Sequence, residues 1–446
     1  MMEMDYLYWY RRGDQPILNR QKTVRPEINN KVVENHASEI VAFKNGYFLT
    51  QPAFYISRKE DSAVTEKVKR LNEYLYLSGK QQADNLVTDW FHTVGIGIVY
   101  VTPYSDEECP VRAYALDPRS AFVVYSRNPG NEPLMGVNIV ISEKTEVIFD
   151  VFTRQKVFRV SGGITGEIVT GTPIVGTAVE VLSEESNILN EIPIIEYQYE
   201  NTRAGSFEPV IPLLDQINNI QSNRVDGIEQ FIQSLMIFYN CQLGEDEEGN
   251  QITPAYIRQA GAIFLKSIGQ DKADLKILSE QLDQTQTQVI VDNMYQQILT
   301  ICGMPSTTKG GTSTSDTGQA VFLRDGWEQA NTFARNTGDL FKVSNKYFDR
   351  IFIKILNRKT DLDIKLSDFE LQFVRNETAN VLVKTQAAMN LKELGFSPEL
   401  AFAKSGVSND PVADVANSEE YIRLKWGAQD NTEVIDESRT EEVQIV

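Results

Sequence analysis

The side chains that most often perform chemistry in proteins are scarce in this sequence. Histidine occurs only twice, as His36 and His92, and each lies within a pattern of apolar residues that predicts a helix. A Ser/His/Asp or Cys/His site would need one of them, and a packing or surface role fits both better. No HExxH motif is present, and the three cysteines, Cys109, Cys241 and Cys302, are far apart. We therefore expect no catalytic residue, no metal site and no cofactor.

One glycine-containing segment invites a phosphate-binding interpretation. From Gly303 to Gly311 the sequence places Lys309 before Gly310 and Gly311. A P-loop instead places its lysine directly after a glycine, and it follows a strand. Here the segment follows a predicted helix, so the pattern does not indicate an NTP-binding protein.

A short acidic run is a second candidate site. Glu245, Asp246, Glu247 and Glu248 lie between two glycines and could attract a divalent ion. The spacing of an EF-hand loop with its closing glutamate is absent. We interpret the run as a solvated turn.

Composition limits the class of protein. The chain has 446 residues, 41% of them hydrophobic, which is enough for two to four domains with their own cores. A net charge of -19 argues against sequence-specific DNA binding, which normally requires a basic surface. No run of about 18 apolar residues predicts a membrane span, and the first residues do not resemble a signal peptide. We expect the chain to act in the reducing compartment where it is made.

The first half of the chain predicts helices followed by an antiparallel sheet. Residues 1–26 mix aromatic and basic side chains without a clear period, so we expect an arm that packs on a neighbouring surface. The apolar period then changes from helical to strand-like near residue 95. Predicted helices cover residues 30–47, 62–77 and 82–94, and predicted strands cover 98–101, 111–116, 121–125, 137–141, 146–152, 156–160 and 192–199.

The second half predicts two long helices around a small insertion. Helices over 209–239 and 285–302 flank short strands at 262–265 and 275–278, and a Gly/Ser/Thr loop covers 306–317. Further predicted elements are a long helix over 319–356 that Gly326 and Gly338 could bend, a strand over 364–373, helices over 377–394, 398–404 and 411–426, and a disordered acidic tail over 427–446.

The two flanking helices leave an alternative open. A helical hairpin cannot bury both faces within one subunit, so copies arranged in a ring would form a channel wall. An ordinary helical domain with a β-insertion fits the same periodicity.

Five blocks of the sequence follow one another in a defined order: residues 30–52, 86–101, 116–125, 192–222 and 302–320. These blocks resemble the portal proteins of long-tailed phages that infect Gram-positive bacteria, and the resemblance extends over residues 27 to 425. Their order and the helix lengths between them carry the resemblance. Where the family often has Gly-x-Pro, this chain has Thr50, Gln51 and Pro52.

The resemblance implies an α+β fold with a multidomain portal architecture: an α/β wing, a two-helix stem, a small α/β clip insertion and a helical crown. The implied parts are a wing over 1–208, stem helices over 209–241 and 285–303, a clip over 242–284, a tunnel loop over 304–317, the remaining wing over 318–375, a crown over 376–426 and the acidic tail over 427–446.

The resemblance also implies a non-enzymatic function in the virion. Copies of the chain, assembled in the host cytoplasm, would form a ring, typically dodecameric, at one capsid vertex for DNA packaging and ejection. Its partners would be the terminase large subunit, a head-completion or adaptor protein, the major capsid and scaffolding proteins and double-stranded DNA. The implied DNA contacts are Thr307, Thr308, Lys309, Gly310, Gly311, Thr312 and Ser313, and the implied docking residues of the clip are Glu245, Asp246, Glu247, Glu248, Tyr256 and Arg258.

Two other classes of protein remain as alternatives. One is another capsid-associated structural protein, such as a connector, although connectors are usually much shorter. The other is a nuclease or an ATPase, which would need a Walker motif or a set of metal-binding carboxylates.

Overall fold

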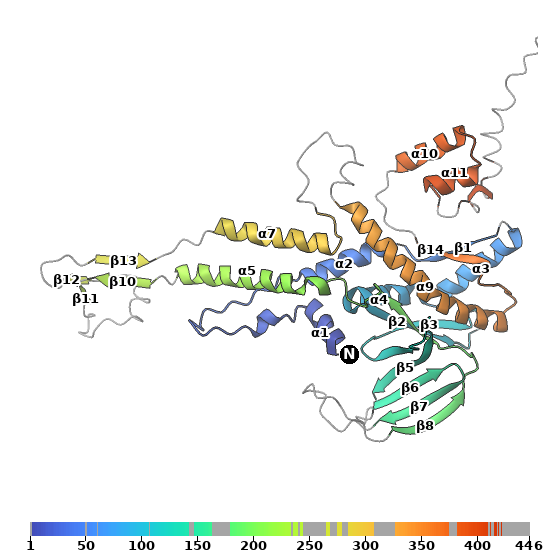
Figure 1. Ribbon diagram of the computed structural model, residues 1–446, viewed down its shortest axis with the longest axis horizontal. Coiled ribbons are helices and arrows are strands. Elements are labelled where there is room, and N and C mark those ends of the chain that lie inside the picture. Colours follow the sequence, from blue (N-terminus) through green and yellow to red (C-terminus); the bar gives the residue numbers. More distant parts are fainter. Residues whose placement is uncertain are drawn as a thin grey trace, which may run out of the picture. The chain divides into compact units, whose positions relative to one another are not determined.

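The computed structural model describes most of the chain and divides it into two compact units. Unit 1 comprises Met1–Arg12, Ala37–Pro209 and Leu299–Val446, and unit 2 comprises Gly13–His36 and Val210–Ile298 (Figure 1). The described residues are 2–49, 51–59, 61–106, 108–141, 147–162, 179–232, 235–239, 241–243, 265–267, 274–278, 284–306, 326–373, 381–408, 411, 414–416, 418 and 421.

Three helices in the first part of the chain contribute to the core of unit 1. They are α2 (His36–Phe48), α3 (Ser62–Leu77) and α4 (Lys80–Val94). The side chain of Asp61 caps α3 by accepting a hydrogen bond from the backbone of Ala63. Gly95 ends α4 with a φ of 88°, and a Cβ there would lie 1.9 Å from the carbonyl oxygen of Arg203. Only glycine permits this close turn from helix to strand.

Antiparallel strands follow, as the sequence predicts. A three-stranded sheet has the order β3-β2-β9, from β2 (Ile96–Pro103), β3 (Val111–Leu116) and β9 (Ile194–Gln198). A five-stranded meander contains β4 (Ala121–Tyr125), β5 (Pro133–Ile141), β6 (Val147–Thr153), β7 (Lys156–Gly162) and β8 (Val179–Ser186). The sequence prediction missed β8, whose exposed side chains include both apolar and acidic residues without a clear alternation.

The longest helix, α9 (Trp327–Lys359), completes the core of unit 1. Its aromatic side chains Phe341, Phe348 and Phe352 are fully buried, and the helix contacts β9, β2 and β3. A two-stranded sheet of β1 (Phe54–Ser57) and β14 (Phe369–Gln372) belongs to the same unit. Gly326 precedes α9 with a φ of 84°. The prediction that Gly326 could bend this helix is therefore wrong, because the residue lies at its N-cap.

A buried polar cluster lies within this apolar core. The Lys80 ammonium pairs with Asp84 and lies 4.6 Å from the centre of the Phe348 ring. The ammonium also lies 5.2 and 5.3 Å from the ring centres of two further aromatic residues, Tyr197 and Phe341. Aromatic faces and one carboxylate thus replace the water that a buried ammonium loses.

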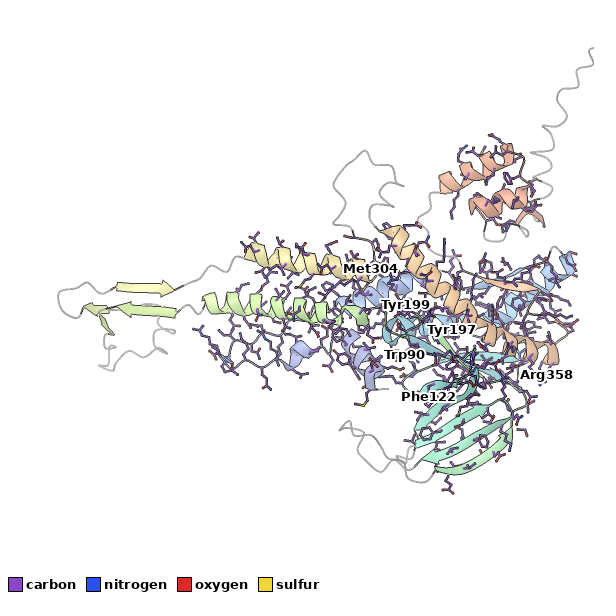
Figure 2. The ribbon with its side chains drawn as sticks, in the orientation of Figure 1. Trp90, Phe122, Tyr197, Tyr199, Met304 and Arg358 are labelled. Atoms are coloured by element: carbon purple, nitrogen blue, oxygen red, sulfur yellow. The ribbon has the colours of Figure 1, made fainter. Side chains whose placement is uncertain are left out.

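The N-terminal segment is more ordered than the sequence suggests. Helix α1 (Met2–Arg11) packs against α4, where Arg11 makes hydrogen bonds of 2.6 and 2.7 Å to both carboxylate oxygens of Asp89. Tyr8 stacks on Trp90, which Figure 2 labels, at a distance of 5.4 Å between the ring centres. The predicted arm therefore packs, over these residues, on its own chain.

The described part of unit 2 contains two long helices and two small two-stranded sheets. Helix α5 (Ile211–Ile232) lies beside α7 (Gln284–Ile301), which ends in unit 1, and Arg224 of α5 donates a 2.7 Å hydrogen bond to Gln288 of α7 (Figure 1). The paired strands are β10 (Leu235–Tyr239) with β13 (Asp274–Leu278), and β11 (Cys241–Leu243) with β12 (Leu265–Ser267).

The prediction of one helix over residues 209–239, and of a stem helix to residue 241, is wrong at its C-terminal end. Helix α5 ends at Ile232, and Leu235–Tyr239 is a strand. This run contains only apolar and aromatic residues, so it has no polar helical face, and its backbone pairs with β13 instead.

Residues 30–35 are not helical either, because they form an extended strap along α5. The backbone amides of Asn30, Val32 and Glu34 donate hydrogen bonds of 2.7, 2.9 and 2.8 Å to side chains of α5. The acceptors, Asp226, Ser222 and Asn218, are spaced by four residues. Two residues of extended chain rise about 6.6 Å and four residues of helix rise about 6 Å, so the two periods match.

Two short helices lie near the C-terminal end of the described chain. They are α10 (Val381–Glu393) and α11 (Pro398–Ser405), and the hydroxyl of Ser397 caps α11. The predicted tail lies outside the described residues. Among the helices that the structure describes, none is long and apolar enough to cross a membrane.

Candidate functional site

The two ends of segment 307–325 are fixed at one place in unit 1, here called the loop base and comprising residues 302–306, 326–337 and Lys44. On the first side, α7 ends at Gly303, whose φ is 61°. The backbone of Met304 donates a 2.8 Å hydrogen bond to the carbonyl of Leu299, which closes the helix terminus. Met304 and Ser306 are buried, so the chain enters the segment from a fixed point (Figure 2).

The second side of the loop base contacts the first. A Cβ on Gly326 would lie 3.8 Å from the carbonyl oxygen of Met304. The side chain of Gln329 donates a 3.1 Å hydrogen bond to the carbonyl of Thr300, across the two ends. The Trp327 ring lies 6.0 Å from that of Tyr47 in α2. Both ends of the segment are therefore held by one cluster.

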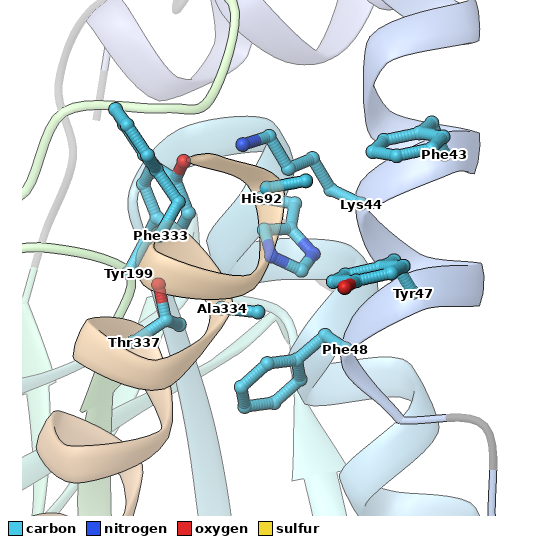
Figure 3. A pocket seen from close by; sticks show the side chains of 10 residues that line it. Phe43, Lys44, Tyr47, Phe48, His92, Tyr199, Phe333, Ala334 and Thr337 are labelled. Carbon is cyan, nitrogen blue, oxygen red and sulfur yellow. The ribbon is translucent and has the colours of Figure 1, made fainter. Parts of the chain in front are cut away.

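Phe333 of α9 is the centre of the loop base. A Cβ added to Gly303 would lie 2.7 Å from Cδ2 of Phe333, so the backbone of Gly303 lies directly against the ring. The Lys44 ammonium lies 4.8 Å from the ring centre (Figure 3). The ring thus joins the end of α7 to α2 through a glycine contact and a cation–π contact.

The charges of the loop base are strongly desolvated. Lys44 is 7% exposed, and burial lowers its pKa to about 8. Burial raises the pKa of the neighbouring Cys302 thiol to about 11. Burial, and then the charges of Lys44 and Arg11, hold the pKa of His92 well below its usual range. At neutral pH we therefore expect a charged lysine beside a neutral thiol and a neutral imidazole.

The cavity beside these charges is too small to hold a substrate. The cavity between α2 and α9 that Figure 3 shows has a volume of about 10 Å³, which holds one water molecule at most. Among the described residues, no group of three or more His, Cys, Asp or Glu side chains is placed to hold a metal ion.

The predicted contact residues lie outside the described part of the chain. This applies to the DNA-contacting set Thr307, Thr308, Lys309, Gly310, Gly311, Thr312 and Ser313, and to the docking set Glu245, Asp246, Glu247, Glu248, Tyr256 and Arg258. Both sets stay predictions. The structure places His92 in the core of unit 1 and His36 in unit 2, where its ring lies 4.7 Å from that of Tyr295.

The sequence prediction missed Lys44 and Phe333. Lys44 follows Ile40 by four residues, so it lies on the apolar face of α2. A lysine at a position of the apolar face predicts a buried charge, and the sequence therefore contained this information. Phe333 carried no comparable signal, since its role depends on the approach of Gly303 from another helix.

Residues 2–425 match the family described as phage portal protein, SPP1 Gp6-like. The chain belongs to this family of structural components of the phage capsid. No curated protein matches it.

Two solved structures are similar to the chain in part. A chain of the "Neck of empty GTA particle computed with C6 symmetry" has 10% identity and a TM-score of 0.46, over 83% of this chain and 90% of that one. A chain of the "Virion of native gene transfer agent (GTA) particle" has 11% identity and a TM-score of 0.44, over 91% and 94%.

Proposed function

We propose that copies of this chain form a ring, a dodecamer in the virion, at one capsid vertex, and that double-stranded DNA enters and leaves the capsid through it. Membership of the portal family supports the proposal. The observation that carries it is the exposed apolar surface of the two helices of unit 2, which one chain leaves uncovered.

That surface lies on α5 and α7. On α5, Val225 and Ile228 are 39% and 52% exposed, and on α7, Val289 and Ile290 are 54% and 49% exposed. Exposed aliphatic side chains grouped on helices mark contact surfaces. Neighbouring copies in a ring would cover them, so α5 and α7 are the stem helices of the proposal.

Residues 304–317 are the proposed tunnel loop. The loop base holds both ends of segment 307–325, which contains most of this loop. Its fixed ends would hold each of twelve loops at one height in the channel while DNA passes. The Lys309 ammonium supplies one charge per subunit, which attracts phosphate without reading bases. Lys309→Ala is expected to lower the rate of DNA packaging and the retention of packaged DNA, and Lys309→Arg, which keeps the positive charge, serves as the matched control. Unchanged packaging and retention would contradict this role.

Residues 242–284 are the proposed clip, which meets the terminase large subunit and later a head-completion or adaptor protein. Glu245, Asp246, Glu247 and Glu248, with Tyr256 and Arg258, are the proposed contacts. Replacement of the four acids by lysine is expected to weaken terminase binding at low salt. Undiminished binding would exclude the acidic turn from the docking surface.

The remaining partners follow from the same proposal. The wing and crown would meet the major capsid and scaffolding proteins during assembly in the cytoplasm of a bacterial, Gram-positive host. No membrane takes part in this assembly.

The ring itself is the first property to measure. Native mass spectrometry and negative-stain class averages of the full chain are expected to show closed rings of about twelve copies. Ile228→Glu with Val289→Glu is expected to abolish the rings, because it places charges in the buried stem contact. Leu394→Glu, at a residue that is 76% exposed in unit 1, is the matched control. Rings that persist in the stem variant would contradict the proposed packing.

A further inference from the structure

The outer face of α9 carries a regular row of basic residues. Every fourth position from 342 to 358 is basic: Lys342, Lys346, Arg350, Lys354 and Arg358. Residues four apart are neighbours on a helix, so these five form one ridge, which winds by about 160° around the helix because each step of four residues turns 400°. At 1.5 Å per residue the ridge is about 24 Å long. Within 342–358 the only acidic residue is Asp349, in a chain whose net charge is -19.

The ridge is solvent-accessible and only loosely neutralised. Lys346 and Arg350 are exposed. The Lys342 ammonium lies 3.5 Å from Glu370 and the Lys354 ammonium lies 3.7 Å from Glu191, both near the limit for an ion pair. Such surface pairs stabilise the folded state by about 0–1 kcal/mol each, so another anion can readily replace the carboxylate beside the lysine.

The last member of the ridge is held by the backbone. Arg358, near the end of α9 (Figure 2), donates a 2.9 Å hydrogen bond to the carbonyl of Ile188. A carbonyl orients the guanidinium without neutralising it, so the charge of Arg358 remains available.

A cleft of about 330 Å³ runs beside the ridge, between α9 and the β1–β14 sheet. Its basic residues are Arg58, Lys342, Lys346 and Arg350, its acidic residues are Asp339, Asp349 and Glu370, and Leu366, Phe369 and Leu371 form its apolar part. The single carboxylate of Glu370 faces both Arg58, at 3.4 Å, and Lys342. Asp349 is buried and accepts hydrogen bonds from Tyr55 and Asn345. Four cations thus face three carboxylates, including the exposed Asp339, so the cleft has an excess of one positive charge, and Lys346 and Arg350 are exposed to solvent.

We propose that this ridge and cleft bind the phosphate backbone of double-stranded DNA, without sequence preference. Successive ridge residues are about 6 Å apart along the helix, a spacing of the same order as that between neighbouring phosphates of one strand. The side chains are long cations, which position a backbone but do not specify bases. The inference rests on the proposed function, because a portal ring brings DNA to the chain, but it concerns residues 342–358 of α9, which are distinct from the tunnel-loop residues 304–317.

The test measures DNA binding and ring assembly separately, on the full chain. The probe is a fluorescent 30-base-pair duplex, titrated at 50 to 200 mM salt. Lys346→Ala with Arg350→Ala removes two charges from the ridge, and Lys69→Ala with Arg127→Ala removes two exposed charges elsewhere in unit 1. Each phosphate contact contributes about 0.9 to the salt slope, so the ridge variant is expected to lower the slope by about 2. The expected loss of affinity at 100 mM salt is on the order of 10- to 100-fold, and the control is expected to bind as the wild type does.

Each outcome decides the inference. No detectable duplex binding by the wild type at 50 mM salt, or equal losses in both variants, would overturn it. A ridge variant that binds DNA normally but no longer forms rings would also overturn it, and would assign the ridge to an acidic surface of a neighbouring copy. A wild type that binds DNA through the ridge but forms no ring would support the inference while contradicting the proposed function.

Discussion

Replacing the buried carboxylate of Asp349 by an amide tests the energetics of the α9 core. Asp349 lies in the polar cluster of unit 1, where its Oδ1 accepts hydrogen bonds from the Tyr55 hydroxyl and, at 2.8 Å, from Nδ2 of Asn345. Burial raises the pKa of Asp349 to about 7, although the Tyr55 hydrogen bond and the charge of Lys80 act in the opposite direction. The folded protein therefore binds a proton that the unfolded chain releases near pH 3.8.

The direction of the pH effect follows from proton linkage. Between pH 3.8 and about 7, the folded state holds one proton more than the unfolded state at this carboxyl, so the stability contribution of Asp349 falls as pH rises. At 1.36 kcal/mol per unit, roughly three units correspond to a loss of about 4 kcal/mol.

Asp349→Asn removes this titration and keeps the hydrogen bonds, since the amide oxygen can accept from Tyr55 and Asn345. We expect the variant to match the wild type near pH 4 and to be more stable by up to about 4 kcal/mol at pH 8. The assay is urea unfolding of the full chain, followed by tryptophan fluorescence at pH 4, 5, 6, 7 and 8. The described tryptophans, Trp9, Trp90 and Trp327, belong to unit 1, so their signal reports on this unit.

Asp339→Asn is the control, because it removes an exposed carboxylate from the same helix. The difference in stability between Asp349→Asn and the wild type should grow with pH, while that of the control should stay constant. A difference that is constant from pH 4 to 8, or that shrinks as pH rises, would refute the reasoning.

Three further predictions concern the loop base and the strap. Lys44→Met should raise the free energy of unfolding at pH 7 by roughly 3 kcal/mol, because the lysine pKa falls from 10.5 to about 8 on folding. Wild-type stability should then rise between pH 8 and 10.5 while that of the variant does not, and a variant that is less stable at pH 7 would contradict this. Gly303→Ala should lower the free energy of unfolding, measured with urea, by about 2 kcal/mol, because alanine disfavours a φ of 61° and its Cβ would contact Phe333. Gly46→Ala is the control, because the space around its Cβ position is open. Ser222→Ala should speed hydrogen exchange of the Val32 amide, while an unchanged rate would show that this hydrogen bond does not protect the strap.

The local sequence pattern was sufficient to predict several regular elements of unit 1, although not α1, β1 or β8. The helix over 62–77 and the strands over 111–116 and 121–125 are confirmed at their predicted bounds. In the helix, the apolar spacing of three and four residues matches the buried side chains of Val68, Leu71 and Leu75, and turn residues follow both strands.

Prediction failed where a distant segment competes for the backbone. Residues 30–35 carry a helical pattern, but their amides bond to side chains of α5 nearly 200 residues away. Leu235–Tyr239 continues the apolar stripe of α5, but it pairs with β13. In both cases the partner was unknown from the local window.

The sequence by itself determined the portal family, the α+β composition and the scarcity of catalytic residues, because these depend on residue types and on short-range period. Only the tertiary structure decided that Lys44 and Gly303 meet at Phe333, and that α9 turns its basic row away from the core. The physical reason is that burial and charge exposure depend on which segments pack together, and no local pattern contains that information.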